Sequence, residues 1–122
     1  MSDPTLWTLI EAADAVASKQ ISARELAQAS IAKAEARQPD LNCFISLDAD
    51  GALAEADAAD AALARGDATG LLHGVPLAHK DMYYRIGKVS TCGSKIRKDF
   101  VPDHTATVLE RLAAAARSIW VV

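Results

Sequence analysis

Residues 73–81, HGVPLAHKD, place a lysine and an aspartate directly behind a short apolar run. The middle of this stretch, residues 75–79, is short, mostly apolar and preceded by a glycine, which predicts a β-strand. Pro76 lacks a backbone N–H, so the strand is expected to lie at a sheet edge or to start there. Because lysine is rarely buried in proteins, Lys80 at the end of an apolar strand is a candidate functional residue.

The composition excludes several classes of protein. The 122 residues suffice for one domain. A net charge of −3 lacks the basic character of a nucleic-acid-binding domain, and no run approaches the roughly 20 apolar residues of a membrane span. Asp3 lies where a signal peptide carries positive charge, and the 2 cysteines, Cys43 and Cys92, are too few for a disulfide framework. We therefore expect a cytoplasmic protein with reduced thiols.

Two capping-box patterns predict a pair of helices in the first part of the chain. Thr8–Glu11 forms the first box and is followed by apolar residues at helical spacing. Ser22–Glu25 forms the second box. The second helix is expected to end by Gln38, because Pro39 disfavours the helical conformation in the residue before it.

The middle of the chain alternates between patterns typical of strands and of helices. Residues 41–48, LNCFISLD, alternate apolar and polar side chains and predict a strand. An Ala-rich helix follows, with Asp48 or Asp50 as its N-cap and Gly66 as its stop. Residues 82–100 show no clear period, and we expect a loop or a weak hairpin there.

The end of the chain completes an α/β pattern. Residues 102–116 predict a further helix, and residues 118–122, SIWVV, form an apolar run that is typical of a strand. A helix pair followed by alternating strands and helices indicates an α/β fold with a mixed sheet.

Lys80 has two interpretations from its position alone. A lysine buried at the end of a strand loses hydration, which lowers its pKa from about 10.4 and makes it a base near neutral pH. The alternative is a lysine that reaches solvent or pairs with Asp81. From spacing alone the alternative is favoured, since a single lysine is a weak signal.

Other reactive side chains give weaker signals. His73, His79, His104 and Cys92 are of the types that bind zinc, but their spacing fits no compact ligand pattern, so we expect ordinary histidines and no metal. Cys92 has no identifiable base to activate it. The stretch TCGS, residues 91–94, is either a polar loop with glycine at positive φ or an anion-binding nest, and the loop is favoured.

Taken together, residues 70–94, GLLHGVPLAHKDMYYRIGKVSTCGS, and residues 103–112, DHTATVLERL, resemble the amidase signature family. The resemblance covers about residues 5–115 and implies the α/β fold of that family. It also implies cleavage of amide bonds by a serine nucleophile, proton relay by a second serine in a cis peptide bond, and a lysine as general base. The implied lysine matches Lys80 alone.

The resemblance extends to the surroundings of the site. Candidate substrate-pocket residues are Asp81, Thr91, Gly93 and Ser94, and neither a metal nor a cofactor is implied. A full-length relative acts on a small amide. The family includes glutaminase subunits of tRNA-dependent amidotransferases, which this stretch does not separate from stand-alone amidases. We expect no direct nucleic-acid or membrane binding, and leave open a homo-oligomer or an association with a related chain.

The sequence departs from the family in one respect. The two family serines lie in a Gly/Ser-rich segment, and these 122 residues contain no Gly-Gly-Ser-Ser-Gly run. We therefore expect residues 1–122 to be a truncated N-terminal part of a single amidase domain that is inactive on its own. The alternatives are a non-enzymatic interaction fragment and a non-functional frameshift product.

The last residues motivate the frameshift hypothesis. Family members usually continue this helix with Ala-Gly-Ala and a strand such as Ile-Tyr-Leu-Gly, whereas residues 113–122 contain no glycine. One choice of codons for Ala116–Val122 encodes Ala-Ile-Tyr-Leu-Gly-Gly in another reading frame. The alternatives to a frameshift are a natural short variant and an artificial cut of a longer sequence. The coding DNA after Val122 distinguishes these three explanations.

Overall fold

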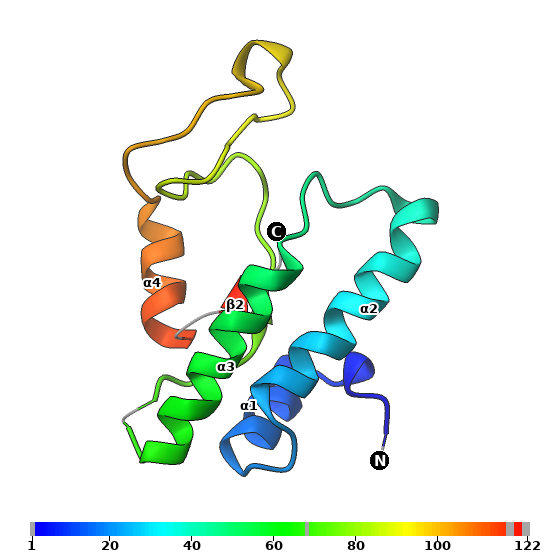
Figure 1. Ribbon diagram of the computed structural model, residues 1–122, viewed down its shortest axis with the longest axis vertical. Coiled ribbons are helices and arrows are strands. Elements are labelled where there is room, and N and C mark those ends of the chain that lie inside the picture. The colour runs from blue at the N-terminus through cyan, green and yellow to red at the C-terminus, as the bar shows by residue number, and fades with distance from the viewer. Residues whose placement is uncertain (1, 68, 117–118, 121–122) are drawn as a thin grey trace.

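The computed structural model describes residues 2–67, 69–116 and 119–120. In Figure 1 the two longest helices lie side by side, and the segment that follows β1 forms a lobe at one end of the molecule. The elements, in chain order, are η1 (Pro4–Leu6), α1 (Leu9–Ala17), α2 (Ala23–Leu41), α3 (Ala49–Arg65), β1 (Pro76–Leu77), η2 (Lys95–Arg97), α4 (Thr107–Ala116) and β2 (Ile119–Trp120).

Both predicted capping boxes are confirmed. At the start of α1 the backbone N–H of Thr8 donates to Glu11 Oε2 at 2.7 Å, and the N–H of Glu11 donates to Thr8 Oγ1 at 3.3 Å. Ser22 and Glu25 make the same reciprocal pair at the start of α2, at 2.9 Å and 3.0 Å. These local hydrogen bonds satisfy backbone donors that have no partner within the helix.

The Ala-rich helix α3 also begins and ends where the sequence predicts. Asp48 is its N-cap and accepts from the N–H of Gly51 at 2.9 Å. Gly66 ends the helix in the left-handed conformation, at φ 76°. Glycine adopts this conformation without the steric cost that a Cβ imposes.

The predicted end of α2 at Gln38 is wrong, because the helix continues to Leu41 with Pro39 inside its last turn. Proline has a helical φ, so the chain can stay helical through Pro39, although this residue cannot donate to the carbonyl of Glu35 and its ring crowds that carbonyl. The helix stops instead at Asn42, which is left-handed at φ 45° and donates its N–H to the carbonyl of Gln38 at 2.8 Å.

The predicted strand over residues 41–48 is also wrong. The residues between α2 and α3 are irregular, and the side-chain amide of Gln38 takes the place of a neighbouring strand. Its Nε2 donates to the carbonyl of Phe44 at 2.7 Å, and its Oε1 accepts from the N–H of Phe44 at 3.0 Å. The alternating pattern therefore marks an extended linker with no described strand beside it.

The core lies among α1, α2 and α3 and is built mainly from alanine. Small side chains let α2 and α3 approach closely, so the close packing compensates for the scarcity of large apolar residues. Its buried members are Ala12, Ala15, Val16, Ile21, Ala23, Leu26, Ala27, Ile31, Ala52, Ala56 and Ala59.

The described strands form one parallel pair. Pro76 of β1 is in register with Ile119 of β2, and Leu77 with Trp120. The strand predicted over residues 75–79 is thus shorter than expected, and α4 connects the pair as in other βαβ units. Of the strand predicted over residues 118–122, positions 118, 121 and 122 lie outside the described residues.

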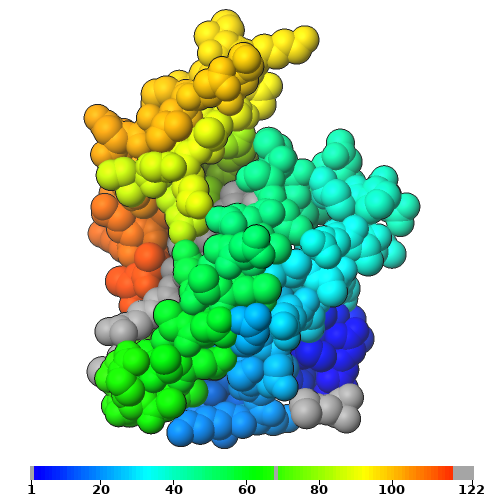
Figure 2. All heavy atoms as spheres, viewed as in Figure 1, coloured from blue at the N-terminus to red at the C-terminus, as the bar shows by residue number. Residues whose placement is uncertain are grey.

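The segment between β1 and α4 is a long loop, which agrees with the loop expected over residues 82–100. Its regular structure among the described residues is η2, and α4 begins at Thr107 rather than at residue 102. Before α4, the N–H of Ala106 donates to the carbonyl of Tyr84 at 2.8 Å. In Figure 2 this loop, yellow to orange, stands above the helices. Within the described ranges, no helix is long and apolar enough to cross a membrane.

Candidate functional site

A cavity of about 870 Å³ lies beyond the end of β1. Three segments form its walls: the linker between α2 and α3, the chain that leaves β1, and the loop around Gly93. The lining residues are Cys43, Phe44, Ile45, Ser46, Asp48, His79, Lys80, Asp81, Met82, Tyr83, Arg85, Lys88, Val89, Cys92 and Gly93.

Lys80 lines this cavity and is exposed, so of its two interpretations the structure shows the lysine that reaches solvent and not the one buried at the end of a strand. The physical reason is that β1 ends at Leu77 and the chain has left the sheet before it reaches Lys80. Within the part of the chain that the structure describes, Lys80 Nζ makes neither a hydrogen bond nor an ion pair. The lysine therefore faces the cavity with its ammonium group available.

Asp81 does not pair with Lys80 and instead binds the loop at Thr91. Its Oδ1 accepts the N–H of Thr91 at 3.0 Å, and its Oδ2 accepts the Thr91 hydroxyl. Burial raises the pKa of Asp81, but hydrogen bonds from Thr91 and from the N–H groups of Gly93 and Cys92 outweigh it and leave the pKa below its ordinary value.

The loop that Asp81 binds has a sharp local shape. Cys92 and Gly93 are both left-handed, at φ 52° and 69°. The N–H of Gly93 donates to Thr91 Oγ1 at 3.0 Å. Ser94 is not among the lining residues, and it caps η2 by accepting from the N–H of Ile96 at 3.3 Å. Of the four candidate pocket residues, Asp81 and Gly93 line the cavity, while Thr91 and Ser94 do not.

The three histidines have separate surroundings. His73 is buried, and its Nε2 donates to the carbonyl of Ala59 at 2.8 Å, which ties the turn before β1 to α3. His79 lines the cavity with Nδ1 3.0 Å from the Lys80 carbonyl. His104 is exposed beside Asp103, at 2.8 Å. No cluster of three or more metal-ligand side chains occurs among the described residues.

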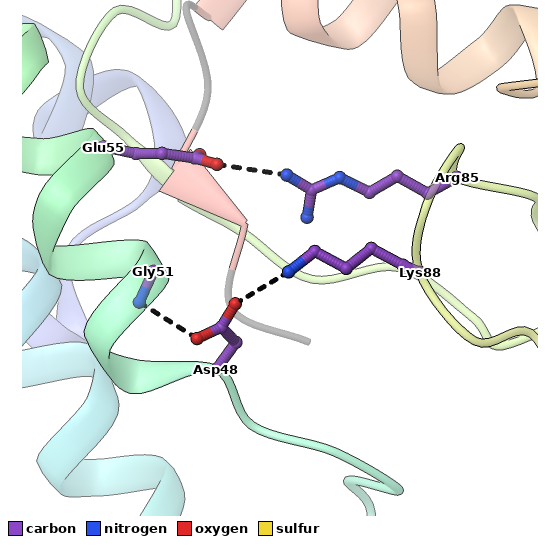
Figure 3. Close-up of polar contacts among 5 residues, drawn as sticks. All are labelled: Asp48, Gly51, Glu55, Arg85 and Lys88. Atoms are coloured by element: carbon purple, nitrogen blue, oxygen red, sulfur yellow. Dashed lines mark hydrogen bonds and ion pairs between the residues drawn. The ribbon is translucent and has the colours of Figure 1, made fainter. Parts of the chain in front are cut away.

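Two ion pairs connect the cavity loop to α3 (Figure 3), and sequence reasoning missed both. Lys88 Nζ lies 3.0 Å from Asp48 Oδ2, and Arg85 Nη2 lies 3.0 Å from Glu55 Oε1. The N–H of Gly51 and the Lys88 ammonium hold the pKa of Asp48 below its ordinary value. The partners of each pair are too far apart in sequence to leave a local signal. The role of Asp48 as a helix cap, by contrast, was predicted from the residues next to it.

Comparisons with known proteins agree with the resemblance seen in the motifs. The Amidase family model matches residues 25–121. The chain is 47% identical over 115 residues to a glutamyl-tRNA(Gln) amidotransferase subunit of Thiobacillus denitrificans, covering 94% of this chain and 23% of that protein. It is 50% identical over 115 residues to the subunit of the same name from Ralstonia nicotianae, covering 94% of this chain and 22% of that protein.

The fold agrees as well. A crystal structure of a bacterial aryl acylamidase of the amidase signature family superposes with a TM-score of 0.87 at 29% identity, covering 94% of this chain and 24% of that one. The chain thus spans about a quarter of the length of the proteins that it matches, 23% of the first relative. Because the family model covers most of its residues, the chain belongs to the Amidase family.

Proposed function

We propose that this chain supplies the general base and one wall of the active site of an amidase, a hydrolase that cleaves the C–N bond of a small amide. The observation that carries the proposal is the position of Lys80. It lines a cavity of about 870 Å³, its ammonium group has no partner among the described residues, and it lies in the stretch on which the family resemblance rests.

In the proposed reaction the neutral amine of Lys80 accepts a proton from a serine in a cis peptide bond. That serine accepts the proton of the nucleophilic serine, whose oxygen attacks the amide carbon. Backbone N–H groups stabilise the resulting oxyanion. The amine product leaves with a proton, and water then hydrolyses the acyl-serine ester.

Both serines belong to a Gly/Ser-rich segment that these 122 residues do not contain. Residues 1–122 are, in this proposal, one part of a single amidase domain, and the polypeptide of these residues alone does not turn over amides. Lys80 becomes desolvated only when further chain covers the cavity. That these residues are a truncated part of a longer amidase stays a prediction, which the coding DNA after Val122 tests.

The setting of this activity is proposed with it. The named relatives are subunits of glutamyl-tRNA(Gln) amidotransferases, so both a stand-alone amidase and one component of such a complex fit the proposal. A direct contact with nucleic acid is not part of it, since the net charge is −3. We place the protein in the cytoplasm.

An assay of three proteins tests the proposal: this chain, a longer protein that includes the Gly/Ser-rich segment, and Lys80→Ala in that longer protein. We expect hydrolysis of simple aliphatic and aryl amides only in the unchanged longer protein. Lys95→Ala is the matched control, because Lys95 is exposed in η2 and does not line the cavity. Amide hydrolysis by the 122-residue chain that disappears with Lys80→Ala would show that the nucleophile lies within these residues.

A second candidate function is non-enzymatic, namely association with a second copy or a related chain. Exposed apolar side chains favour it, since Leu71 and Ile96 are 92% and 96% exposed. Sedimentation at several concentrations tests this candidate. A monomer at all concentrations, with and without the related chain, contradicts it.

A further inference from the structure

Asp81 uses both its carboxylate and its carbonyl group to bind one short loop. The carboxylate accepts the N–H and the hydroxyl of Thr91. The carbonyl oxygen accepts the hydroxyl of Ser90 at 2.8 Å and the N–H of Cys92 at 3.3 Å. Ser90 is only 2% exposed, so its hydroxyl has little access to water and depends on this acceptor.

The loop turns sharply beside this carboxylate, because Cys92 and Gly93 are both left-handed. The carboxylate binds the start of the turn directly, through the Thr91 N–H. It binds the end of the turn indirectly, through the Thr91 hydroxyl, which accepts from the N–H of Gly93. The nearby N–H groups of Gly93 and Cys92 also help to hold the pKa of Asp81 below its ordinary value.

We infer that Asp81 is a positioning residue: its carboxylate is a built-in anion that fixes the loop Thr91–Gly93 and, through the adjoining peptide bond, the direction of Lys80. The inference rests on the proposed role of Lys80 as the base. Because Thr91 binds both carboxylate oxygens, Asp81 neither pairs with Lys80 nor takes part in proton transfer.

The geometry explains how one carboxylate orients two walls of the cavity. Asp81 follows Lys80 directly, and with its carbonyl and carboxylate both held, the peptide between the two residues cannot rotate freely. The N–H of Tyr83 donates to the Lys80 carbonyl at 3.0 Å and fixes the other side of the same turn. Cys92 and Gly93, the left-handed residues of the loop that Asp81 binds, line the same cavity.

The first test follows the backbone amides of Thr91 and Gly93 by NMR in the 122-residue chain. Their proton shifts should titrate with the Asp81 carboxylate, below the usual range for aspartate. Asp81→Ala should abolish that titration and speed hydrogen exchange at both amides by at least about tenfold. Asp99→Ala is the matched control, because Asp99 is exposed and its ion pair among the described residues is with the neighbouring Lys98, at 3.3 Å.

The second test supplies the missing anion. Formate is a free carboxylate small enough for the space left in Asp81→Ala, so formate should restore slow exchange at Thr91 and Gly93. Sodium chloride at the same ionic strength should not. If Asp81→Ala does not fold, Thr91→Val serves instead, since it removes the hydroxyl at nearly constant volume and should release the Gly93 amide and raise the pKa of Asp81.

The outcomes separate this inference from the proposed function. Unchanged exchange in Asp81→Ala, no effect of formate, or an unaltered Asp81 titration in Thr91→Val overturns the inference whatever the activity of the protein. Conversely, formate rescue of the amides together with an inactive Lys80-containing longer protein supports the role of Asp81 in the loop and rejects the proposed base. In an active longer protein, formate should also raise the kcat of Asp81→Ala, with little change in KM.

Discussion

The carboxylate of Asp60 in α3 accepts hydrogen bonds from the backbone N–H groups of Ala23 and Arg24, at 2.7 Å and 3.1 Å, at the start of α2. Ser22, the local cap of α2, reaches the N–H of Glu25. A side chain of one helix therefore completes the cap of its neighbour, and the first turn of α2 is anchored to the middle of α3. This contact aligns the two helices whose alanines form most of the core.

Replacing Asp60 by alanine is expected to destabilise the chain by roughly 1–3 kcal/mol, because the two N–H groups of α2 lose their acceptor in a partly buried place. Asp57→Ala is the matched control. Asp57 lies on the same helix and pairs with Arg24 at 2.5 Å, but both side chains are about half exposed. The control should cost no more than about 0.5 kcal/mol. Urea unfolding followed by circular dichroism measures both values, and equal losses would contradict the role of Asp60.

Asp48 combines a helix cap and an ion pair, and substitutions separate the two contributions. Asp48→Ala loses both and should cost about 1 kcal/mol or slightly more. Asp48→Ser keeps a cap oxygen and should recover most of that loss. Lys88→Ala removes only the ion pair, and since both partners are about half exposed it should cost no more than about 0.5 kcal/mol. Thermal unfolding of the three variants checks this order, and a larger loss in Lys88→Ala than in Asp48→Ala contradicts it.

The elements that sequence reasoning predicted well are those set by neighbouring residues. The capping boxes of α1 and α2, the Asp48 cap and the Gly66 stop all depend on side chains within a few positions of the helix end. The predicted strand over residues 41–48 failed, because a strand needs a partner and the backbone of Phe44 finds Gln38 instead. Alternation of apolar side chains carries no information about what lies beside them.

The candidate site was also predicted well only where the signal lies in neighbouring residues. The motif identified Lys80 and the loop Thr91–Ser94, and spacing alone favoured a Lys80 that reaches solvent, but neither revealed that Asp81 binds Thr91. That contact depends on where β1 ends and on how the loop returns ten residues later. The pair of Asp81 and Thr91 left no sequence signal, although the favoured interpretation of TCGS, a polar loop with glycine at positive φ, is confirmed by Gly93 at φ 69°.

Gly74, which lies in the stretch HGVPLAHKD of residues 73–81, has a structural role that a substitution tests. Gly74 is left-handed at φ 75°, and a Cβ there would lie 2.8 Å from Ala23 Cβ and 3.0 Å from Val16 Cγ1. Gly74→Ala should therefore cost about 2–4 kcal/mol, from backbone strain and from crowding between α1 and α2. Gly87→Ala is the control, because Gly87 has φ 73° but open space around its missing Cβ, so only about 1–2 kcal/mol of strain is expected.

Denaturant midpoints of the two glycine variants measure this difference. The substitution at Gly74 should lower the midpoint clearly more than the one at Gly87, with similar slopes. Equal midpoints would mean that the turn before β1 moves away from α1 and α2 at little cost, and would reject the close approach as the reason for glycine at this position.

Stability should fall in acid, because several carboxylates have a lowered pKa in the folded chain. Hydrogen bonds from Thr8 hold the pKa of Glu11 below its ordinary value, and those from Ser22 do the same for Glu25. A group whose pKa is lower in the folded state stabilises it fully above the pKa of the unfolded state, and this contribution is lost as the pH falls through the folded pKa. The ordinary values are 4.5 for Glu11 and Glu25 and 3.8 for Asp48 and Asp81. The loss is therefore expected below these values, and not near neutral pH.

The double variant Glu11→Gln, Glu25→Gln tests the capping-box share of this effect. Glutamine keeps the acceptor that completes a capping box but does not titrate. Near neutral pH the variant should be slightly less stable than the unchanged chain, because a carboxylate accepts a hydrogen bond more strongly and interacts favourably with the start of a helix. As the pH falls from about 6 to about 3, the variant should lose less stability than the unchanged chain, since it has two fewer groups to protonate. Midpoint temperatures across this range give the comparison. Parallel losses in the two proteins would mean that the capping-box carboxylates do not contribute to the acid sensitivity, and would leave Asp48 and Asp81 as the groups to substitute next.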